Sequence, residues 1–490
     1  MLKTKAQDVI GVLTSAAADL LKTEKRKYLC FYFVSVLLFT ASFWYLPSSV
    51  LSESTNQNFD WWSESIIYAD IMYHTDFPSE SAALPQTLNL PRLIEHYGVM
   101  HNYEDYVKIA YETGNVTFEK RDYEAYTSNV VIQRFFFRLL DHVLPCSNTT
   151  KIALYRFLNC LLLAFMISVI PYWIMKKTGS FKTGMVMLVP FVLFAPNLIM
   201  YGKNLYWCAW ILLMPTVVMM LLTESNYFAR SNYKLLLLSA AACLTVFVKC
   251  LFYFEFITSV MISMMIPVIY YLLNLDGGKE TVKKKLTWFF TISAFAVVGF
   301  LLVILIKNAL VSHYYAHTPG VNNADGILVE NLKNRLFGNP QADDPGVAES
   351  AKASLLYVLG IMAKKPFVSI KNIFSLTHMG LILLTAAASV AVVFLDRMTN
   401  GKVSNKIRYW LICCWISMAA PLSWFILAKP HTYIHNEHCS FTWFLLFDFM
   451  ALSVIALPFK QIIVLIRQNH ASLLSLPSVN KQSSDHDDHP

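Results

Sequence analysis

Several short motifs that mark soluble enzymes are missing from this sequence. It has no phosphate-binding loop of the Gly-x-x-x-x-Gly-Lys-Ser/Thr type, no Gly-x-Gly-x-x-Gly fingerprint and no His-Glu-x-x-His pair. Its nine cysteines include no Cys-x-x-Cys pair, so a zinc ribbon or a thioredoxin-like site lacks support. These absences argue against an ATP-driven pump and against a nucleotide-sugar enzyme built on a soluble fold.

Charged residues are also scarce. They make up 15% of the 490 residues, against about 25% in a typical soluble domain. Hydrophobic residues make up 56%, and the mean hydropathy is +0.45. The apolar residues gather in runs of about 17–25 residues, the length needed to cross about 30 Å of hydrocarbon. The sequence therefore predicts an all-α membrane protein.

We predict about ten transmembrane helices, because the apolar runs occur along almost the whole chain. The runs cover residues 28–47, 153–174, 183–201, 205–222, 235–248, 255–274, 288–308, 376–395, 408–428 and 442–460.

The net charge of +8 would suggest a nucleic-acid partner in a soluble protein. Here the Lys and Arg residues flank the apolar runs, beginning with Lys25, Arg26 and Lys27. They recur in alternate connections, which is typical of cytoplasmic loops that orient the helices. We therefore expect no nucleic-acid partner and place both termini in the cytoplasm.

This orientation divides the chain into three parts. Residues 1–27 are expected to be a cytoplasmic segment without a cleavable signal, 28–467 the transmembrane domain, and 468–490 a disordered cytoplasmic tail. No internal repeat is visible, which weighs against transporters built from repeated halves. Because the long loops are all on the outer side, we expect the protein to work on that face. The outer loops are 48–152, 309–375 and 429–441.

The first outer loop contains a short amphipathic segment, Ser128 to Pro145. It is too short and too charged to span a membrane. Arg134 and Arg138 would share one helical face, with Phe, Leu and Val residues on the other. We predict an interfacial helix that contacts membrane lipid.

Acidic residues of the same loop are the candidates for a general base. Asp60, in Asn-Phe-Asp-Trp-Trp-Ser-Glu, comes first, and Glu64, Asp70 and Asp122 follow. A carboxylate held among aromatic residues near a membrane surface can act as a base. For any single one of these acids, a solvated loop residue is the simpler interpretation. The choice of the base therefore depends on how soon each acid follows the first span.

The most unusual stretch is Lys-Pro-His-Thr-Tyr-Ile-His-Asn-Glu-His, from Lys429 to His438. Its histidines, His431, His435 and His438, would share one face of a helix. With Lys429 they could bind the phosphate of a lipid-linked donor, because imidazole nitrogens can donate hydrogen bonds to oxygen. Metal binding is a second interpretation and a polar interfacial loop a third.

Three further ionisable residues fall at the outer membrane boundary: Lys203, Lys249 and Glu255. Charged groups at such depth are costly and often functional. Lysines near helix ends can instead extend to water, which is the favoured interpretation of Lys203.

The layout of the predicted spans and loops resembles that of a known class of membrane enzymes. The long first outer loop with an acid soon after the first span resembles the GT-C class of membrane glycosyltransferases. Within that class the layout is similar to bacterial serotype-converting enzymes that decorate O-antigen. The class often has a pair of acids in the first loop, and here Asn58-Phe-Asp60 only approximates it. Further points of similarity are Tyr126-Thr-Ser-Asn-Val-Val-Ile-Gln133, Asn204-Leu-Tyr-Trp207 and Lys429-Pro-His-Thr-Tyr-Ile-His435.

The resemblance implies a polyprenyl-phosphate sugar as donor, an O-antigen-like glycan as acceptor, and inversion at the anomeric carbon. It also implies a bacterial inner membrane with the active face toward the periplasm. Asp60 would be the base, and Asp122, Glu64 and Asp70 would be the lower-ranked candidates for this role. No cofactor is required, although a divalent metal is compatible with the chemistry. Substrate contacts would come from Lys249, Glu255, Lys429, His431, Tyr433, His435, Arg134 and Lys203.

Two other classes stay open. An O-antigen or capsule polymerase has a similar layout, with outer-loop arginines that bind a lipid diphosphate. A lipid-linked glycan flippase would need a charged central cavity, and charges are scarce in the middle of the predicted spans.

Overall fold

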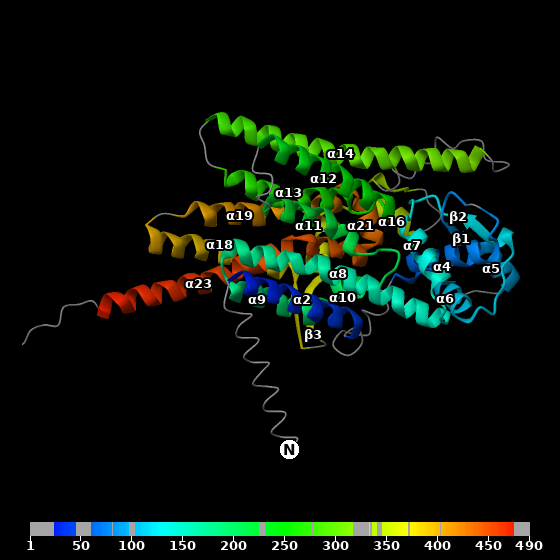
Figure 1. The fold of residues 1–490 in the computed structure, drawn as a ribbon, viewed down its shortest axis with the longest axis horizontal. Coiled ribbons are helices and arrows are strands. Elements are labelled where there is room, and N and C mark those ends of the chain that lie inside the picture. The colour runs from blue at the N-terminus through cyan, green and yellow to red at the C-terminus, as the bar shows by residue number, and fades with distance from the viewer. Residues whose placement is uncertain are drawn as a thin grey trace, which may run out of the picture.

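Long apolar helices that lie side by side form the body of the molecule (Figure 1). The computed structural model describes residues 24–45, 60–80, 82–97, 103–224, 231–275, 279–316, 333, 336–340, 345–370, 373–401 and 403–474. The predicted cytoplasmic N-terminal segment up to residue 23 and the predicted tail beyond residue 474 therefore lie outside the described residues.

Within these ranges, seven helices are long and apolar enough to cross a membrane, or up to eight if the bent pair within 346–364 is one span. Three shorter apolar helices lie among them. These segments coincide with the predicted runs, and they confirm the expected all-α membrane protein. The seven are α2 (Glu24–Tyr45), α8 (Asn148–Thr178), α12 (Ser231–Phe252), α14 (Lys279–Ala316), α18 (His378–Asn400), the pair α19 (Asn405–Ser417) and α20 (Ala419–Leu427), and α23 (Phe447–Leu474); the shorter three are α9 (Phe181–Leu193), α11 (Trp210–Glu224) and α13 (Ile257–Leu273).

The helices pack as neighbouring pairs, with α12 along α14, α2 along α8, and α18 along α23. The first pair requires a glycine at its contact. A Cβ atom at Gly299 of α14 would lie 2.3 Å from the carbonyl oxygen of Cys243 in α12. Any side chain there would push the two helices apart, as is usual where small residues allow close helix contact in membranes.

Helix α8 joins the membrane domain to the first outer segment. The Ser147 side chain accepts a hydrogen bond from the backbone N–H of Thr150 at its start, and Gly179, with φ of 62°, ends it. Its 31 residues span about 46 Å, more than the about 30 Å of hydrocarbon. The first turns of α8 can therefore stand beyond the hydrocarbon, where they contact the outer segment.

The outer segment lies at one end of the bundle, on the right in Figure 1. The elements of this segment are α4 (Trp61–Asp76), β1 (Gln86–Leu88), α5 (Leu90–Tyr97), α6 (Tyr103–Thr113), η1 (Lys120–Asp122), β2 (Tyr123–Ala125) and α7 (Gln133–Val143). Strands β1 and β2 pair antiparallel, with Thr87 opposite Glu124.

Helix α7 has the two faces that the sequence predicts for an interfacial helix. Arg134 and Arg138 both approach Asp70 of α4. Phe136 and Leu139 are among the exposed apolar residues on its other side. The apolar face is therefore free to contact lipid.

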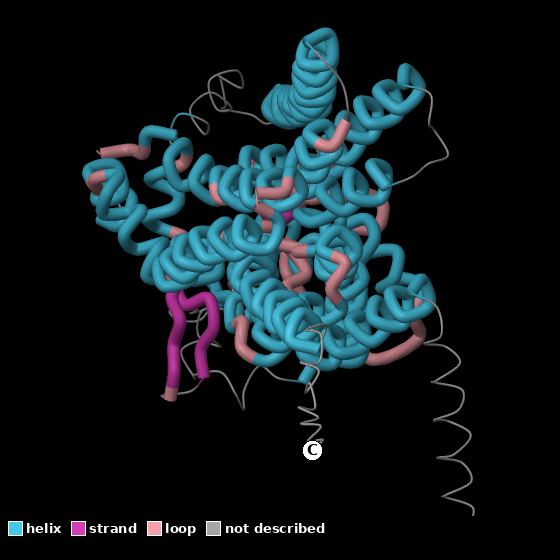
Figure 2. The backbone as a smooth tube through the Cα atoms, turned by 90° about the vertical axis from the view of Figure 1, so that its left-hand side faces the viewer, coloured by secondary structure: helices cyan, strands magenta, loops and turns pink. Residues whose placement is uncertain are grey.

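The second outer segment folds back on itself. Helices α16 (Pro345–Lys352) and α17 (Leu355–Lys364) meet at a bend of 111°. The hairpin of β3 (Pro366–Ile370) and β4 (Phe374–Thr377) follows and projects from the side of the bundle (Figure 2). The remaining short helices are α10 (Pro196–Tyr201), α21 (Lys429–Ile434), α22 (Asn436–Cys439) and η2 (Ser440–Leu445).

Candidate functional site

Asp60 stands immediately before α4 and caps its first turn. Its Oδ1 accepts a hydrogen bond from the backbone N–H of Ser63 at 3.0 Å. An aspartate favours this position because it satisfies an unpaired N–H and faces the positive end of the helix dipole. The backbone therefore fixes where the carboxylate points.

Two other segments of the chain reach the same carboxylate. The indole Nε1–H of Trp207 donates to Asp60 Oδ2 at 2.7 Å. The imidazole Nε2 of His438 lies 3.0 Å from the same oxygen. In addition, the Asn204 side-chain amide donates to the Asp60 backbone carbonyl at 3.0 Å. Asp60 thus joins the first outer loop, the turn before α11 and the histidine stretch.

The surroundings of Asp60 favour its charged form. Burial raises the pKa of its carboxyl, but the hydrogen bond and positive charge of His438 and the hydrogen bonds from Ser63 outweigh burial. Together they hold the pKa of Asp60 well below its usual range. The carboxylate is therefore ionised at neutral pH, and its side chain is still 10% exposed.

The turn that carries Trp207 is held by buried hydrogen bonds. The Asn204 Oδ1 accepts the backbone N–H groups of Tyr206 and Trp207, each at 3.0 Å. The Tyr253 hydroxyl donates to the carbonyl of Trp207 at 2.7 Å. Asn204, Tyr206 and Tyr253 are nearly or fully buried, so the position of the indole is closely defined.

Among the described residues, three other than glycine have positive φ angles, and two of them, Cys208 and Phe256, adjoin this turn. The three are Val131, Cys208 and Phe256, with φ of 52°, 38° and 61°. Cys208 follows Trp207 directly, and the Phe256 ring lies 5.5 Å from the Trp207 ring, centroid to centroid. The backbone N–H of Val131 donates to the Phe252 carbonyl at 3.2 Å. Such strain often accompanies functional sites.

Glu64 has a different environment from Asp60, although both belong to the start of α4. Its side chain is fully buried and forms an ion pair with Arg156 of α8. It also accepts hydrogen bonds from the Tyr68 hydroxyl at 3.0 Å and the Leu205 backbone N–H at 3.2 Å. These contacts fasten α4 to α8 and to the turn before α11.

Asp70 and Asp122 are also buried and engaged. Asp70 lies 3.0 Å from Arg134 Nη1 and 3.6 Å from Arg138 Nε, and it accepts the Gln86 backbone N–H at 3.0 Å. Asp122 forms a capping box with Glu119 at the short helix η1. Neither acid has a recorded contact with Asp60, and their predicted role stays untested.

The predicted substrate-binding lysines donate mainly to backbone carbonyls. Lys249, fully buried, donates to the carbonyls of Tyr253 and Glu255 where α12 ends. Lys429 donates to the carbonyls of Ala351 at 3.1 Å and Ala353 at 2.6 Å. A role for either lysine in substrate binding remains a prediction.

The remaining predicted substrate contacts, Lys203, Glu255 and Tyr433, each have a separate partner. The Lys203 ammonium lies 5.3 Å from the Trp44 ring centroid. The Glu255 carboxylate accepts from Asn129 Nδ2 at 3.2 Å. The Tyr433 hydroxyl donates to Glu349 at 3.3 Å, on the outer face of α21.

The three histidines are neighbours even though two short helices, α21 and α22, replace the single helix that their spacing suggested. The ring centroids of His431 and His435 are 4.7 Å apart, and those of His435 and His438 are 5.7 Å apart. His435 is exposed. The described residues contain no group of three His, Cys, Asp or Glu side chains arranged to hold a metal ion.

Sequence reasoning did not predict that Trp207 and His438 contact Asp60. Both lay in stretches that it had singled out, one in Asn204-Leu-Tyr-Trp207 and the other in the histidine pattern. No sequence signal shows that they meet Asp60, because contacts over such chain separations depend on how the helices pack.

Comparisons with known proteins add little to this description. No family model matches the chain, and no curated protein is significantly similar in sequence. A crystal structure of the *Archaeoglobus fulgidus* oligosaccharyltransferase in the apo form aligns over 92% of this chain and 52% of that one. The identity is 10% and the TM-score 0.42, and the chain spans about half the length of that protein. Function must therefore be argued from the residues.

Proposed function

We propose that this chain is a membrane glycosyltransferase. It transfers a sugar from a polyprenyl-phosphate donor to a hydroxyl of a cell-surface glycan, with inversion, on the non-cytoplasmic face of the membrane. The membrane is taken to be a bacterial inner membrane and the acceptor O-antigen-like. The observation that carries the proposal is the Asp60 carboxylate, held by Trp207 and His438 where three separate segments meet.

A comparison of the acids supports Asp60 as the base. Glu64 and Asp70 are fully buried and paired with arginines, so neither carboxylate is open to an acceptor hydroxyl. Asp122 is buried in a capping box. Asp60 alone of these four is paired with a histidine and keeps part of its side chain exposed.

The chemistry requires one proton transfer and one displacement. Asp60 accepts the proton of the acceptor hydroxyl while that oxygen forms a bond to the anomeric carbon of the sugar. The bond from this carbon to the phosphate oxygen breaks, and polyprenyl phosphate leaves with the electron pair. His435 lies beside His438, and His431 lies beside His435; we propose that both donate hydrogen bonds to the phosphate.

The arginines of the outer loop weigh against a polymerase. Arg134 and Arg138 both face Asp70, and Arg121 pairs with Glu119. Arg134 is buried against Asp70 and Arg121 is engaged by Glu119, so these two arginines are less available to a lipid diphosphate. Gene disruption separates the classes, because a transferase loss removes a side branch. A polymerase loss shortens the glycan, and a flippase loss traps the lipid-linked precursor inside.

The decisive experiment is sugar transfer in membranes with matched amounts of wild-type and Asp60→Asn protein. Asparagine keeps the size of the side chain but cannot accept the proton, so transfer should fall by about 10²–10⁴-fold. Binding of the lipid-linked donor should change little. Asp76→Asn is the control, because Asp76 is an exposed acid at the other end of the same helix.

Near-full transfer by Asp60→Asn would show that Asp60 is not the base. If Asp122→Asn then abolished transfer, the reaction would stand with the role moved to Asp122. If no acid of the first outer loop mattered, the inverting mechanism would lose its basis.

A further inference from the structure

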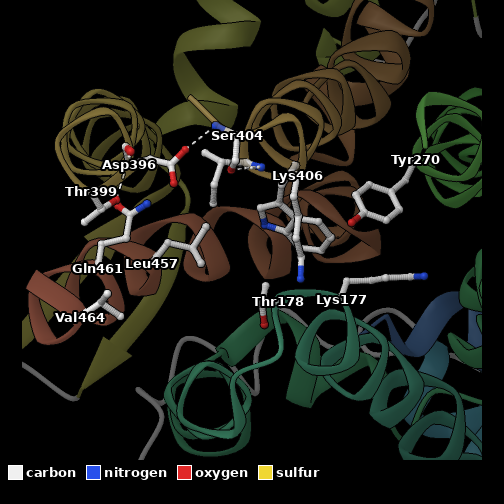
Figure 3. A pocket seen from close by; sticks show the side chains of 12 residues that line it. Lys177, Thr178, Tyr270, Asp396, Thr399, Ser404, Lys406, Leu457, Gln461 and Val464 are labelled. Atoms are coloured by element: carbon white, nitrogen blue, oxygen red, sulfur yellow. Dashed lines mark hydrogen bonds between the residues drawn. The ribbon is translucent and has the colours of Figure 1, made fainter. Parts of the chain in front are cut away.

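A cavity with both apolar and polar side chains in its wall, drawn in Figure 3, lies at the end of the bundle away from α4 (Figure 1). It has a volume of about 250 Å³ and is enclosed by the end of α8, helix α13, the link between α18 and α19, and α23. A neighbouring cavity of about 230 Å³ shares Lys177 and Tyr270 with it. The two cavities adjoin at these residues, and we call them together the recess.

Two lysines and two acids line the recess, and a third lysine, Lys176, lies beside it, which leaves a small excess of positive charge. Glu224 is shared by two lysines, Lys177 and Lys176, the latter at 2.9 Å. One carboxylate therefore faces two ammonium groups. Lys406 adds a third, and the described residues place no carboxylate within ion-pair distance of it. In Figure 3 the Lys406 side chain extends into the cavity toward Thr178 and Lys177.

The acid in the wall, Asp396, does not offset this charge at the same place. It is buried and accepts the Ser404 backbone N–H at 2.6 Å, which closes the link between α18 and α19. Figure 3 places it across the cavity from the Lys406 ammonium. Ser404 also caps the start of α19, so the positive end of that helix dipole adjoins the recess.

The depth of the recess indicates what can reach it. Helix α8 ends at Thr178, α18 ends at Asn400 and α19 begins at Asn405, so the recess lies where spanning helices enter and leave the bilayer. Its wall includes Tyr270 and Trp410, whose ring centroids are 5.5 Å apart. Such aromatic residues are typical of the headgroup level of membranes.

We propose that this recess binds the phosphate headgroup of an anionic membrane lipid. Lys406 and Lys177 contact the phosphate, and Tyr270 and Trp410 pack against the adjoining glycerol and upper chain. Basic pockets between transmembrane helices near one membrane surface are suited to this role. The proposal is independent of the transferase reaction, because none of these residues belongs to the Asp60 site.

The test uses the purified full chain in a neutral detergent, with binding followed by native mass spectrometry and by thermal stabilisation. The probes are dioctanoyl phosphatidic acid, dioctanoyl phosphatidylcholine and inorganic phosphate. We expect phosphatidic acid to bind and phosphatidylcholine to bind much more weakly. Lys406→Gln should weaken phosphatidic acid binding by about 10–100-fold, the loss of one charge-assisted contact. Lys406→Arg should restore most of the affinity.

Lys182→Gln is the matched control, since Lys182 is an exposed lysine in α9 that does not line the recess. Equal binding of phosphatidic acid by wild type and Lys406→Gln would overturn the proposal. So would equal binding of phosphatidylcholine. If inorganic phosphate bound as tightly as the lipid, the site would be one for free phosphate and the lipid assignment would be wrong.

Discussion

The partnership of His438 with Asp60 can be tested through the pH dependence of the reaction. His438→Gln keeps a side-chain N–H that can donate to Asp60, but it removes the imidazole, which when protonated carries a positive charge 3.0 Å from the carboxylate oxygen. At that distance two unit charges interact by about 1.4 kcal/mol at the dielectric constant of water and about 5.5 kcal/mol at an effective value of 20. Loss of this attraction should raise the pKa of Asp60.

The direction of the effect follows from which form of Asp60 is active. A base works when it is ionised, so the rate falls as the pH drops through the pKa of Asp60. In the wild type this pKa lies well below its usual range, so the rate limited by Asp60 should be flat above about pH 4. Without the charge of His438, burial becomes the leading influence and raises the pKa of Asp60 toward that range.

The assay is the initial rate of sugar transfer, measured from about pH 4, close to the usual pKa of an aspartate, to about pH 7. The ratio of the rates at the two ends should be near one for the wild type and clearly lower at the acid end for His438→Gln. His142→Gln, which alters an exposed histidine on α7, is the control and should keep the wild-type profile. Parallel profiles for wild type and His438→Gln would refute the proposed electrostatic coupling, even if the variant were slower overall.

Two further predictions concern stability and orientation. Glu64→Gln leaves Arg156 without its buried partner, so the free energy of unfolding in detergent should fall by about 3–5 kcal/mol, and unchanged stability would contradict the structural role of this pair. In the predicted orientation, a cysteine placed at Gly114 should react with a membrane-impermeant reagent in intact cells and one at Gly278 should not; the reverse pattern would invert the topology.

The helices were predictable from sequence because crossing a membrane imposes a length and a composition on each run. The predicted run 235–248 was the shortest, yet α12 extends from Ser231 to Phe252. Its end contains Lys249, which interrupts the apolar pattern but remains helical. The buried ammonium donates to carbonyls just beyond α12, and this contact is a tertiary feature that hydropathy does not report.

The sequence could not show which of the acids pairs with an arginine and which caps a helix. Asp60 and Glu64 are four residues apart, and their spacing predicts a shared helical face. In the structure, Asp60 is the cap that precedes α4, and Glu64 is buried against Arg156, 92 residues further along the chain. Which acid is paired with an arginine depends on how α8 packs against α4. The sequence could therefore nominate the acids but could not rank them by environment.

The strained residues around Trp207 bear on why the site has this form. Backbone conformations of this kind cost about 1–3 kcal/mol each, and the cost is high for a β-branched residue such as Val131. Glycine at Val131, Cys208 or Phe256 would avoid it. The surrounding contacts, including the Asn204 hydrogen bonds to the turn, hold these conformations in place. Stability alone does not account for two such residues, Cys208 and Phe256, beside one indole, whereas a requirement to hold its N–H at the Asp60 carboxylate does.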